Sequence, residues 1–331
     1  MHAQLRDAEW LTAIWEPLGR VEKLLRECVS TSSGRLREVV NYTLSSGGKR
    51  IRPVITLLSA QAVGDVNERT IAYAAAIELI HTASLLHDDV IDNAKVRRGM
   101  VTANVLWGDS AAIVGGDFLL ACAFELLSRY ADVHAMCDIA GTAQKMCHGQ
   151  MLELMHAFDA QMSRDQYLEI VRLKTAELFA SACFAGSLSG GAAIEDATRL
   201  RNFGLLIGIA FQIVDDLLDI VGSESVLGKP IGQDLKSGKM TLPVIELLEK
   251  LRSEGDGPLL KRIEDSLNER SVSDELVSVL QQLIVTHGID KLVRSYARQL
   301  SHSAMEVLKC PHAQRCEALS SIAKFVVDRE L

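Results

Sequence analysis

Residues 72–92 of this 331-residue chain read AYAAAIELIHTASLLHDDVID, and their Leu, Ile and Ala side chains recur every three or four positions. This spacing is typical of the apolar face of an α-helix. Residues 167–186, YLEIVRLKTAELFASACFAG, show the same pattern. Strand-like alternation between hairpin turns is not convincing anywhere along the chain. The sequence therefore predicts an all-α protein of about a dozen helices.

Three glycine pairs are the clearest candidates for helix ends, because glycine is common just after the last helical residue. They are Gly47–Gly48, Gly115–Gly116 and Gly190–Gly191. At ~150 residues per domain, the length allows one large domain or two small ones. No linker, tract or charge run divides the chain, and this favours a single domain over residues 1–331.

Composition excludes some classes of partner and compartment. The net charge is −8, so non-specific binding to nucleic acid is not expected. Seven cysteines occur without a CxxC pair, which suits reduced thiols in the cytoplasm. The N-terminal residues lack the apolar core of a signal peptide. The longest uncharged apolar run, residues 203–214, falls short of the ~20 residues of a membrane span. We therefore expect a soluble cytoplasmic protein.

Two acidic motifs carry the strongest functional signal. Residues 88–92 and 215–219 both read DDxxD, and each motif follows an apolar run. The first and last aspartates of each motif are four residues apart, so they share a helix face, where like charges destabilise a helix by a few tenths of a kcal/mol. Bound cations reverse that effect. Oxygen ligands without His or Cys suit Mg²⁺, which readily shares its coordination shell with phosphates. The motifs thus favour a Mg²⁺-bridged phosphate or diphosphate.

Three other interpretations of the motifs compete with this one. Each motif alone could be a solvated acidic turn, but two copies, each closing an apolar helix, argue against that. The spacing does not fit an EF-hand loop. A two-metal nuclease or polymerase would normally also present a basic surface, which this acidic chain lacks.

A basic segment, SSGGKRIRP at residues 45–53, precedes the first motif. It is not a P-loop, since Arg follows Lys49 and Thr43 stands where the first glycine belongs. A glycine pair followed by Lys and Arg at a helix start can nevertheless bind an anion. The alternative is an ordinary basic loop.

Other polar residues lie near the motifs in sequence. His81 is seven residues before Asp88 and thus shares its helix face, although a lone histidine is more often structural. Lys174 and Thr175 interrupt an apolar helix, where a lysine usually extends its amine to solvent. Residues 228–243, GKPIGQDLKSGKMTLP, suggest a mobile basic loop that closes over phosphates.

Taken together, these segments resemble the trans-isoprenyl diphosphate synthases, also called polyprenyl synthetases. The resemblance covers nearly the whole chain and rests on five motifs in order: GGKRIRP, HTASLLHDDVID, RRG, FQIVDDLLDI and GKPIGQDLKSGKMTLP. It implies an all-helical bundle around a deep central cavity, usually in a homodimer. It also implies a prenyltransferase that condenses isopentenyl diphosphate with an allylic diphosphate, such as farnesyl or geranylgeranyl diphosphate, by ionisation, condensation and elimination.

The resemblance further implies roles for individual residues. Three Mg²⁺ ions on the allylic diphosphate would be held by Asp88, Asp92 and Asp215, supported by Asp89, Asp216 and Asp219. Isopentenyl diphosphate would bind Lys49, Arg52, His81 and Arg98. The allylic diphosphate would also bind Arg97, Lys174, Lys229 and Lys239, while Thr175 and Gln212 would line the gap between the substrates. No protein base is nominated, because pyrophosphate is the usual candidate.

Product length depends in this family on residues just before the first motif, which line a tunnel for the growing chain. Here Ala76, Ala83 and Ser84 are small. The first motif also has two residues between its aspartate pair and its last aspartate, whereas many bacterial short-chain synthases that resemble this chain have four. Both features favour a product of more than twenty carbons, of the octaprenyl or solanesyl type, for a quinone side chain. Because such a product is very apolar, its release is compatible with transient contact between the protein and a membrane.

The alternative is a geranylgeranyl or farnesyl diphosphate synthase in which a bulky residue elsewhere closes the tunnel. Candidates for that residue are Met146, Met151, Leu152, Met155 and Phe158. Terpene cyclases share the first motif, but the intact second motif and GGKRIRP argue against them. A non-catalytic partner subunit of a heteromeric synthase would be expected to have lost the aspartates.

Overall fold

The computed structural model describes residues 9–130, 132–222, 231–255, 257–308 and 316–328. It is almost entirely helical, which confirms the predicted fold class. The chain forms two compact units. The first comprises Met1–Ala143, Leu178–Gly204 and Val307–Ser321, and the second comprises Gln144–Glu177, Leu205–Glu306 and Ile322–Leu331. The single domain expected from the sequence over residues 1–331 stays a prediction.

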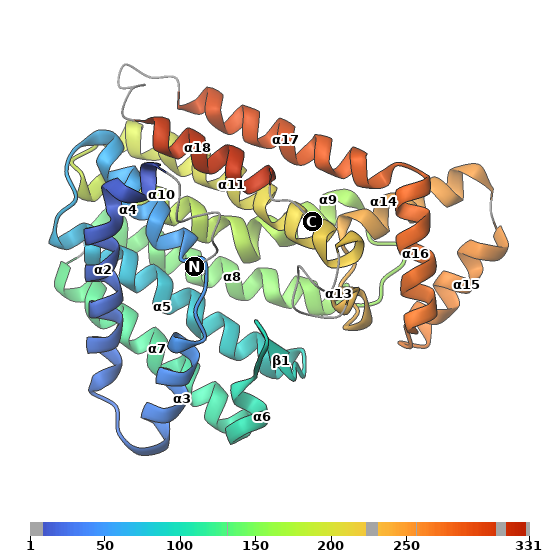
Figure 1. The fold of residues 1–331 in the computed structure, drawn as a ribbon, viewed down its shortest axis with the longest axis horizontal. Helices are drawn as coiled ribbons and strands as arrows, with labels where there is room; N and C mark the ends of the chain where they lie inside the picture. The colour runs from blue at the N-terminus through green and yellow to red at the C-terminus, as the bar shows by residue number, and fades with distance from the viewer. Residues whose placement is uncertain (1–8, 131, 223–230, 256, 309–315, 329–331) are drawn as a thin grey trace. The chain divides into compact units, whose positions relative to one another are not determined.

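Figure 1 follows the elements in chain order. Those up to residue 130 are α2 (Glu9–Ser30), α3 (Gly34–Ser45), α4 (Ile51–Val63), α5 (Glu68–Ile91), β1 (Val96–Arg97), β2 (Met100–Val101), α6 (Ala103–Trp107) and α7 (Asp109–Tyr130). The later ones are α8 (Val133–Met155), α9 (Arg164–Val171), the π-helical turn η1 (Arg172–Ala176), α10 (Glu177–Ser189), α11 (Ile194–Val221), α13 (Gln233–Lys236), α14 (Leu242–Glu254), α15 (Gly257–Asn268), α16 (Asp274–Thr286), α17 (Ile289–Val307) and α18 (Glu317–Val327).

Helix α5 is the core of the first unit. It packs against α2, α4 and α7, and α5 and α7 run side by side in Figure 1. Every residue from 70 to 80 is buried, as expected of a helix that is apolar on all sides. Asn67 and Thr70 form a capping box at its start. Because α5 is packed along most of its length, the position of its carboxyl end, which carries the first aspartate motif, is fixed.

Two glycines bring α10 against the backbone of α4. A Cβ on Gly186 would lie 2.2 Å from the carbonyl oxygen of Thr56, and one on Gly190 would lie 2.6 Å from that of Ala60. No side chain fits at such distances, so glycine is required for the two helices to approach this closely. The contact anchors α4, whose first three residues belong to the basic segment.

The glycine pairs do not all end helices. Gly47–Gly48 and Gly190–Gly191 follow α3 and α10, as predicted. Gly115–Gly116 lies inside α7, so that prediction is wrong. A Cβ on Gly115 would lie 2.9 Å from Val39 Cγ1, and one on Gly116 would lie 2.3 Å from His87 Nε2. These glycines serve close packing against α3 and α5 rather than a turn.

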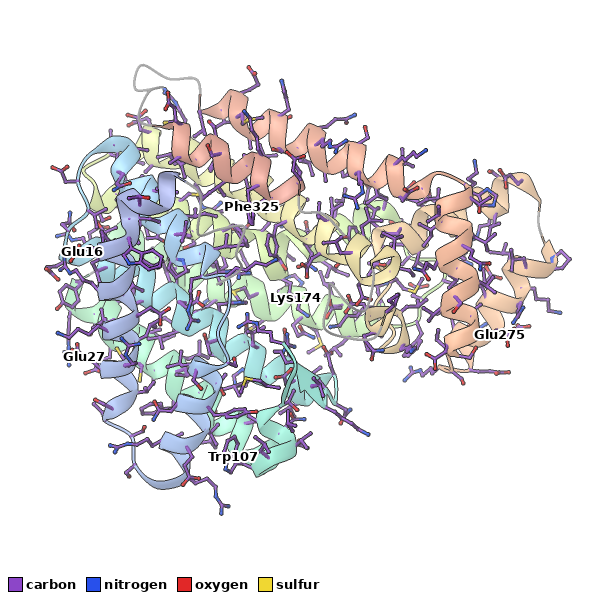
Figure 2. All side chains as sticks on the ribbon, in the orientation of Figure 1. Glu16, Glu27, Trp107, Lys174, Glu275 and Phe325 are labelled. Carbon is purple, nitrogen blue, oxygen red and sulfur yellow. The ribbon has the colours of Figure 1, made fainter. Side chains whose placement is uncertain are left out.

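A short hairpin follows the first motif. Strands β1 and β2 pair antiparallel, with Val96 opposite Val101. Arg98 and Gly99 between them both have positive φ, at +54° and +76°, the geometry of a tight two-residue hairpin loop. Strands of two residues are too short to show alternation in the sequence, so neither strand was predicted. Nearby, Trp107 packs edge-on against Tyr42, with ring centroids 5.2 Å apart (Figure 2).

The second unit is arranged around α14, which packs against α9, α15 and α16. Ser163 and Gln166 form a capping box that starts α9. Helix α9 then continues directly into η1, a turn wider than the α-helix. Such π-helical turns occur mostly as single interruptions of α-helices and often at functional sites. Here the turn carries Lys174 and Thr175, two of the residues singled out by the sequence.

Among the described residues, one helix is long and apolar enough to cross a membrane. It is α7, whose apolar window is 44% buried inside the protein. The core helix of a globular protein meets the same test of length and composition, and α7 packs along α5 in the first unit.

The contact of α10 with α4 gives a test of the fold. We expect Gly186→Ala to lower the free energy of unfolding by about 1–3 kcal/mol, because the added methyl overlaps the Thr56 backbone. Gly141→Ala in α8 is the control, since no heavy atom lies within 4 Å of that Cβ. Alanine favours a helix by roughly 0.5–1 kcal/mol, so the control variant should be no less stable than the wild type. Urea denaturation measures both, and equal effects would contradict the packing.

Candidate active site

The first aspartate motif lies at the carboxyl end of α5. Asp88 and Asp89 belong to its last turn, and Asp92 caps it by donating its backbone N–H to the Asp88 carbonyl at 2.8 Å. Asp89 is buried, and Arg97 Nε donates to its Oδ1 at 2.6 Å. Burial raises the pKa of Asp89, Arg97 opposes this, and Asp88 and Asp92 raise it further. The predicted crowding of acids is therefore present, and an arginine from β1 partly offsets it.

Cationic residues gather around His81 in the same unit. The pKa of His81 is lowered well below its ordinary value, first by burial and then by the charges of Arg52, Arg98, Arg97 and Arg50. The imidazole is thus neutral among arginines that come from α4 and from the hairpin. We call Arg52, His81, Asp88, Asp89, Asp92, Arg97 and Arg98 the first cluster. Neutral imidazole beside guanidinium groups is a suitable environment for an anion.

The hairpin is joined to the basic segment through a glycine. Arg98 donates to the Gly47 carbonyl oxygen. A Cβ on Gly48 would lie 2.8 Å from Arg98 Nη1. Lys49 follows this contact, in the connection between α3 and α4. The segments that carry the predicted isopentenyl diphosphate ligands are therefore in contact with one another.

Arg50 has a structural role that the sequence did not distinguish. Its guanidinium donates to Glu22 Oε1 at 2.6 Å, to Glu78 Oε1 at 2.7 Å and to the Leu44 carbonyl at 3.0 Å. Glu78 is buried in α5. Arg50 also precedes α4 with a left-handed backbone, at φ +49°. Of the three cations in KRIR, Arg50 thus joins α2, α3 and α5 to the start of α4.

The second aspartate motif lies near the end of α11, in the second unit. Asp215 is exposed, whereas Asp216 and Asp219 are buried. Asp219 accepts backbone N–H bonds from two residues that follow residue 230. Its Oδ2 accepts from Asp234 at 3.1 Å, and its carbonyl accepts from Gly232 at 2.9 Å. The end of α11 is therefore tied to the segment that carries Lys239.

Asp216 lies in a buried network of hydrogen bonds. Tyr167 donates its hydroxyl to Asp216 Oδ2 at 2.6 Å, and Gln212 Nε2 donates to Oδ1 at 2.6 Å. Gln212 Oε1 accepts from the Thr175 hydroxyl at 3.0 Å. Burial and the charge of Asp234 raise the pKa of Asp216 well above its ordinary value, and the two donors act in the opposite direction. We call Tyr167, Thr175, Gln212, Asp215, Asp216 and Asp219 the second cluster.

Lys174 is held in η1 by an ion pair. Its Nζ donates to Glu153 Oε2, on α8. A Cβ on Gly149 would lie 2.6 Å from the Lys174 backbone nitrogen, so glycine lets α8 approach the π-helical turn closely. Figure 2 labels Lys174 at this turn. The ion pair, rather than extension of the amine to solvent, fixes this lysine.

The predicted basic loop is described only in part. Lys229 lies outside the described residues. Lys236 pairs with Asp274, and Lys239 donates its backbone N–H to the Asp234 carbonyl at 2.9 Å. Residues 233–236 form the short helix α13. Closure of this segment over phosphates stays a prediction.

Sequence reasoning missed three polar residues that contact the predicted ones: Glu153, Tyr167 and Asp234. Asp234 stands within GQDLKSGK, where one acid among basic residues was a usable signal. Tyr167 lies on α9 and Glu153 on α8, and each meets its partner from a different helix. No spacing along the chain indicates these two contacts.

The predicted tunnel residues lie on α5. Ala76 and Ala83 are fully buried, and Ser84 is half-buried with its hydroxyl donating to the His81 carbonyl at 2.8 Å. Of the alternative stoppers, Phe158 packs against Gly238, whose Cβ position lies 2.4 Å from the phenyl ring. Met151 and Met155 are exposed on α8. The course of a tunnel stays a prediction.

The carboxylates offer ligands for a divalent ion but not a complete shell. Among the described residues, no group of three or more His, Cys, Asp and Glu side chains is arranged to hold a metal ion. Asp88 and Asp92 are half-buried and Asp215 is exposed, so their oxygens can reach a ligand. Mg²⁺ prefers few carboxylates and completes its shell with water and phosphate oxygens. This donor set fits an ion that binds together with a diphosphate.

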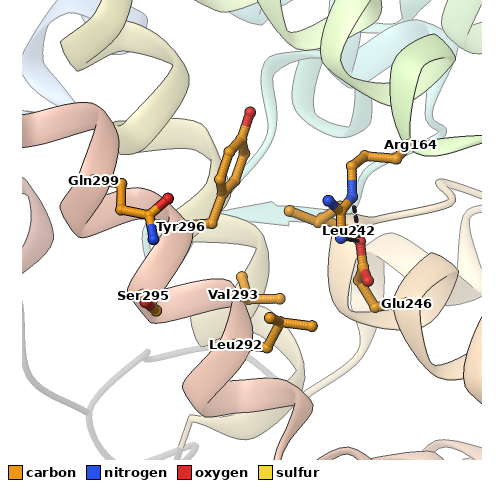
Figure 3. Close-up of a pocket in the computed structure, with 8 residues that line it drawn as sticks. All are labelled: Arg164, Leu242, Glu246, Leu292, Val293, Ser295, Tyr296 and Gln299. Atoms are coloured by element: carbon orange, nitrogen blue, oxygen red, sulfur yellow. Dashed lines mark hydrogen bonds and ion pairs between the residues drawn. The ribbon is translucent and has the colours of Figure 1, made fainter. Parts of the chain in front are cut away.

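A separate pocket of about 160 Å³ lies in the second unit (Figure 3). Its walls are α9, α14 and α17, and it contains none of the residues predicted from the sequence. Arg164 Nε donates to Glu246 Oε1 at 2.5 Å beside it, and the guanidinium carbon lies 5.9 Å from the Tyr296 ring centroid. The ion pair neutralises both charges and joins the start of α9 to α14.

Comparison with known proteins agrees with this geometry. Residues 33–280 match the family model of polyprenyl synthetases. The chain is 37% identical over 326 residues to a short chain isoprenyl diphosphate synthase of Methanothermobacter thermautotrophicus, covering 94% of this chain and 99% of that one. It is 32% identical over 311 residues to heptaprenyl diphosphate synthase component 2 of Bacillus subtilis, covering 94% and 87%.

A crystal structure has the same fold. It is a polyprenyl synthase of Caulobacter crescentus CB15 complexed with calcium and isoprenyl diphosphate. The TM-score is 0.90 at 33% identity, and the match covers 97% of each chain. That relative therefore has a divalent ion and an isoprenyl diphosphate in its structure.

The ion pairs of Arg50 give a test of the first unit. We expect Arg50→Ala to lower the free energy of unfolding by about 3–5 kcal/mol, because it leaves the buried Glu78 carboxylate without its cation. Arg20→Ala removes an exposed ion pair with Glu68 and should cost less than about 1 kcal/mol. Urea denaturation of both variants distinguishes them. Equal losses would contradict the structural role of Arg50.

Proposed function

Because the chain belongs to the polyprenyl synthetase family and is a trans-prenyl diphosphate synthase, we propose that it extends an allylic diphosphate with isopentenyl diphosphate to a trans-polyprenyl diphosphate of more than twenty carbons. The reaction depends on Mg²⁺ in this proposal. The observation that supports it best is the first cluster, where a half-buried pair of carboxylates lies in the same unit as a neutral His81 surrounded by arginines. Carboxylates for metal ions and cations for diphosphate oxygens thus occur together.

Each cluster has a distinct part in the proposed reaction. Asp88 and Asp92 in the first cluster, and Asp215 in the second, provide the carboxylates that bind Mg²⁺. When bound, the ions supply positive charge that stabilises the departing pyrophosphate. Arg97, Lys174, Lys229 and Lys239 bind the allylic diphosphate and add to this stabilisation. Loss of the allylic C–O bond leaves a carbocation, which must be shielded from water by the apolar helices.

Isopentenyl diphosphate then attacks the carbocation. Its diphosphate binds Lys49, Arg52, His81 and Arg98, so the alkene is held in one orientation and the reaction gains from proximity. Attack by the terminal alkene carbon forms the new C–C bond, and loss of a proton restores a double bond. Each cycle adds one isoprene unit. In this proposal His81 donates a hydrogen bond as a neutral imidazole, because burial first and then the surrounding arginines lower its pKa.

Product length rests on the small side chains of α5. Ala76, Ala83 and Ser84 place no bulk before the first motif. The two relatives described above are named as a short-chain and a heptaprenyl synthase. Their names therefore do not decide between a product of more than twenty carbons and a shorter one. We therefore base the length of more than twenty carbons on α5, with a geranylgeranyl or farnesyl product as the alternative. A cytoplasmic location and transient membrane contact for product release belong to the same proposal.

A second candidate is that the chain is one component of a heteromeric synthase. The Bacillus subtilis relative is named component 2, which favours this candidate. Against a non-catalytic role, both aspartate motifs are intact. We favour an active homodimer, because Val105 and Leu106 on α6 and Val114 on α7 are large apolar side chains that stay exposed in one chain. A purified chain that sediments at twice 36.2 kDa and is active alone supports the homodimer.

Product analysis tests the function directly. Purified protein is incubated with Mg²⁺, radiolabelled isopentenyl diphosphate and farnesyl diphosphate, and the dephosphorylated products are separated by chain length. We expect products beyond twenty carbons. Asp88→Ala and Asp215→Ala should each lower turnover by at least about 1,000-fold, because each removes a metal ligand. Asp196→Ala, an exposed aspartate of α11, is the control and should retain turnover. Near-normal activity of Asp88→Ala would overturn the metal assignment.

A bulky residue in α5 tests the tunnel. Ser84→Phe should shorten the product while Mg²⁺ dependence is kept, because Ser84 is half-buried and leaves room for a larger side chain. Ala83→Phe is less suitable, since Ala83 is fully buried and overpacking costs about 1–3 kcal/mol. Ser84→Ala is the matched control and should leave the product unchanged. An unaltered product with Ser84→Phe would show that the chain does not grow past this residue.

A further inference from the structure

Tyr167 makes a buried contact with the second aspartate motif that the proposed reaction does not use. Its side chain is 3% exposed, and its hydroxyl donates to Asp216 Oδ2 at 2.6 Å. Asp216 is 5% exposed. A buried carboxylate is costly unless its oxygens accept hydrogen bonds. Tyr167 therefore satisfies one oxygen of a carboxylate that stands between Asp215 and Asp219.

The second oxygen of Asp216 is also occupied. Gln212, one turn earlier on α11, donates to Oδ1 at 2.6 Å. Two donors on opposite oxygens fix the plane of the carboxylate. Because Gln212 uses its amide nitrogen on Asp216, its oxygen faces Thr175 and accepts from that hydroxyl at 3.0 Å. The orientation of Asp216 thus determines the orientation of both Gln212 and Thr175.

Tyr167 itself is held firmly. It lies on α9, one turn after Arg164, which is paired with Glu246 on α14 (Figure 3). Seven residues later the same continuous helix reaches Lys174, which is paired with Glu153. An element fixed at both ends by ion pairs gives the phenol little freedom. The hydroxyl is therefore a preorganised donor rather than an adjustable one.

The choice of donor is also informative. Asp216 has Asp215 beside it in sequence, and Asp234 acts on it as a nearby charge. A cation in place of Tyr167 would pair with these acids and compete with a bound metal ion. A phenol provides a hydrogen bond without adding charge. The carboxylates of the motif thus stay available to a divalent ion while Asp216 stays fixed.

We propose that Tyr167 is a positioning residue for the prenyl transfer reaction: its hydroxyl orients Asp216, and through Gln212 it also orients Thr175. This inference rests on the proposed function. Tyr167 touches neither substrate nor metal in this role. Loss of its hydroxyl leaves Asp216 with a single donor, so the end of the second motif and the Thr175 hydroxyl lose their fixed arrangement.

The test compares two buried tyrosines. Tyr167→Phe removes the hydroxyl that binds Asp216. Tyr73→Phe is the control, because Tyr73 is also fully buried but its hydroxyl accepts a hydrogen bond from the Asp132 backbone at 3.1 Å, and Asp132 belongs to neither cluster. Each variant removes one hydrogen-bonded hydroxyl from a buried tyrosine, and thermal unfolding of both separates a loss of stability from a loss of function. A difference in activity between the two folded variants then reports the orientation of Asp216 rather than a loss of folding.

Two measurements are made on each variant. Isothermal titration calorimetry measures binding of inorganic pyrophosphate in the presence of Mg²⁺, and steady-state assays measure kcat and KM. Residues that orient a metal ligand typically contribute 10- to 100-fold to metal affinity or activity. We expect Tyr167→Phe to weaken Mg²⁺–pyrophosphate binding about tenfold and to lower kcat by about 10- to 100-fold, whereas Tyr73→Phe should change neither by more than about twofold.

A double-mutant cycle shows whether Tyr167 acts through Asp216. In an Asp216→Ala background, which has no side-chain oxygen to accept from Tyr167, adding Tyr167→Phe should lower kcat by less than about twofold, because coupled residues are non-additive. This pair also serves if the single variant fails to fold. The inference would be overturned if Tyr167→Phe lowered kcat in that background as much as it does in the wild type. It would also be overturned if Tyr167→Phe and Tyr73→Phe had the same kcat and the same affinity for Mg²⁺–pyrophosphate. A wild-type chain that binds no Mg²⁺–pyrophosphate and incorporates no isopentenyl diphosphate would instead overturn the proposed function.

Discussion

The cost of holding several carboxylates together at the end of a buried helix governs both clusters. The carboxyl end of a helix carries partial negative charge, so aspartates there are disfavoured even before they repel one another. Each motif has at least one buried aspartate, and the cost of burying that carboxylate is compensated differently in the two motifs. Asp89 receives a cation, Arg97, whereas Asp216 receives the neutral donors Tyr167 and Gln212. The remaining carboxylates, such as Asp88 and Asp215, stay accessible. The two motifs thus combine buried, hydrogen-bonded acids with carboxylates that are accessible to solvent.

Close approach of backbones is the second constraint. Gly186 and Gly190 let α10 meet α4, and Gly149 lets α8 meet η1. A contact at backbone distance leaves little freedom for sliding, because any displacement creates overlap or a void. Lys174, which is nominated for diphosphate binding, lies at the Gly149 contact. Glycines inside helices therefore serve rigidity in this protein rather than turns.

The basic residues divide into those that hold the protein together and those that remain for a ligand. Arg50 and Arg164 are each committed to a buried glutamate. Lys174 is paired with Glu153, which fixes its direction while the pair stays partly exposed. Burial and then the arginines around His81 lower the pKa of this residue. A count of positive charges in the sequence would have treated all of them alike.

The sequence by itself determined the helical fold, the two aspartate motifs and the family. Periodicity reveals a helix because apolar spacing reflects one buried face, and DDxxD is legible because its residues are neighbours along the chain. Only the tertiary structure decided which acids are buried, that Gly115–Gly116 lies inside α7, and that Arg50 is structural. Tyr167 with Asp216 and Glu153 with Lys174 also emerged only there. These contacts join residues of different helices, and their partners depend on how the helices pack, which no local spacing records.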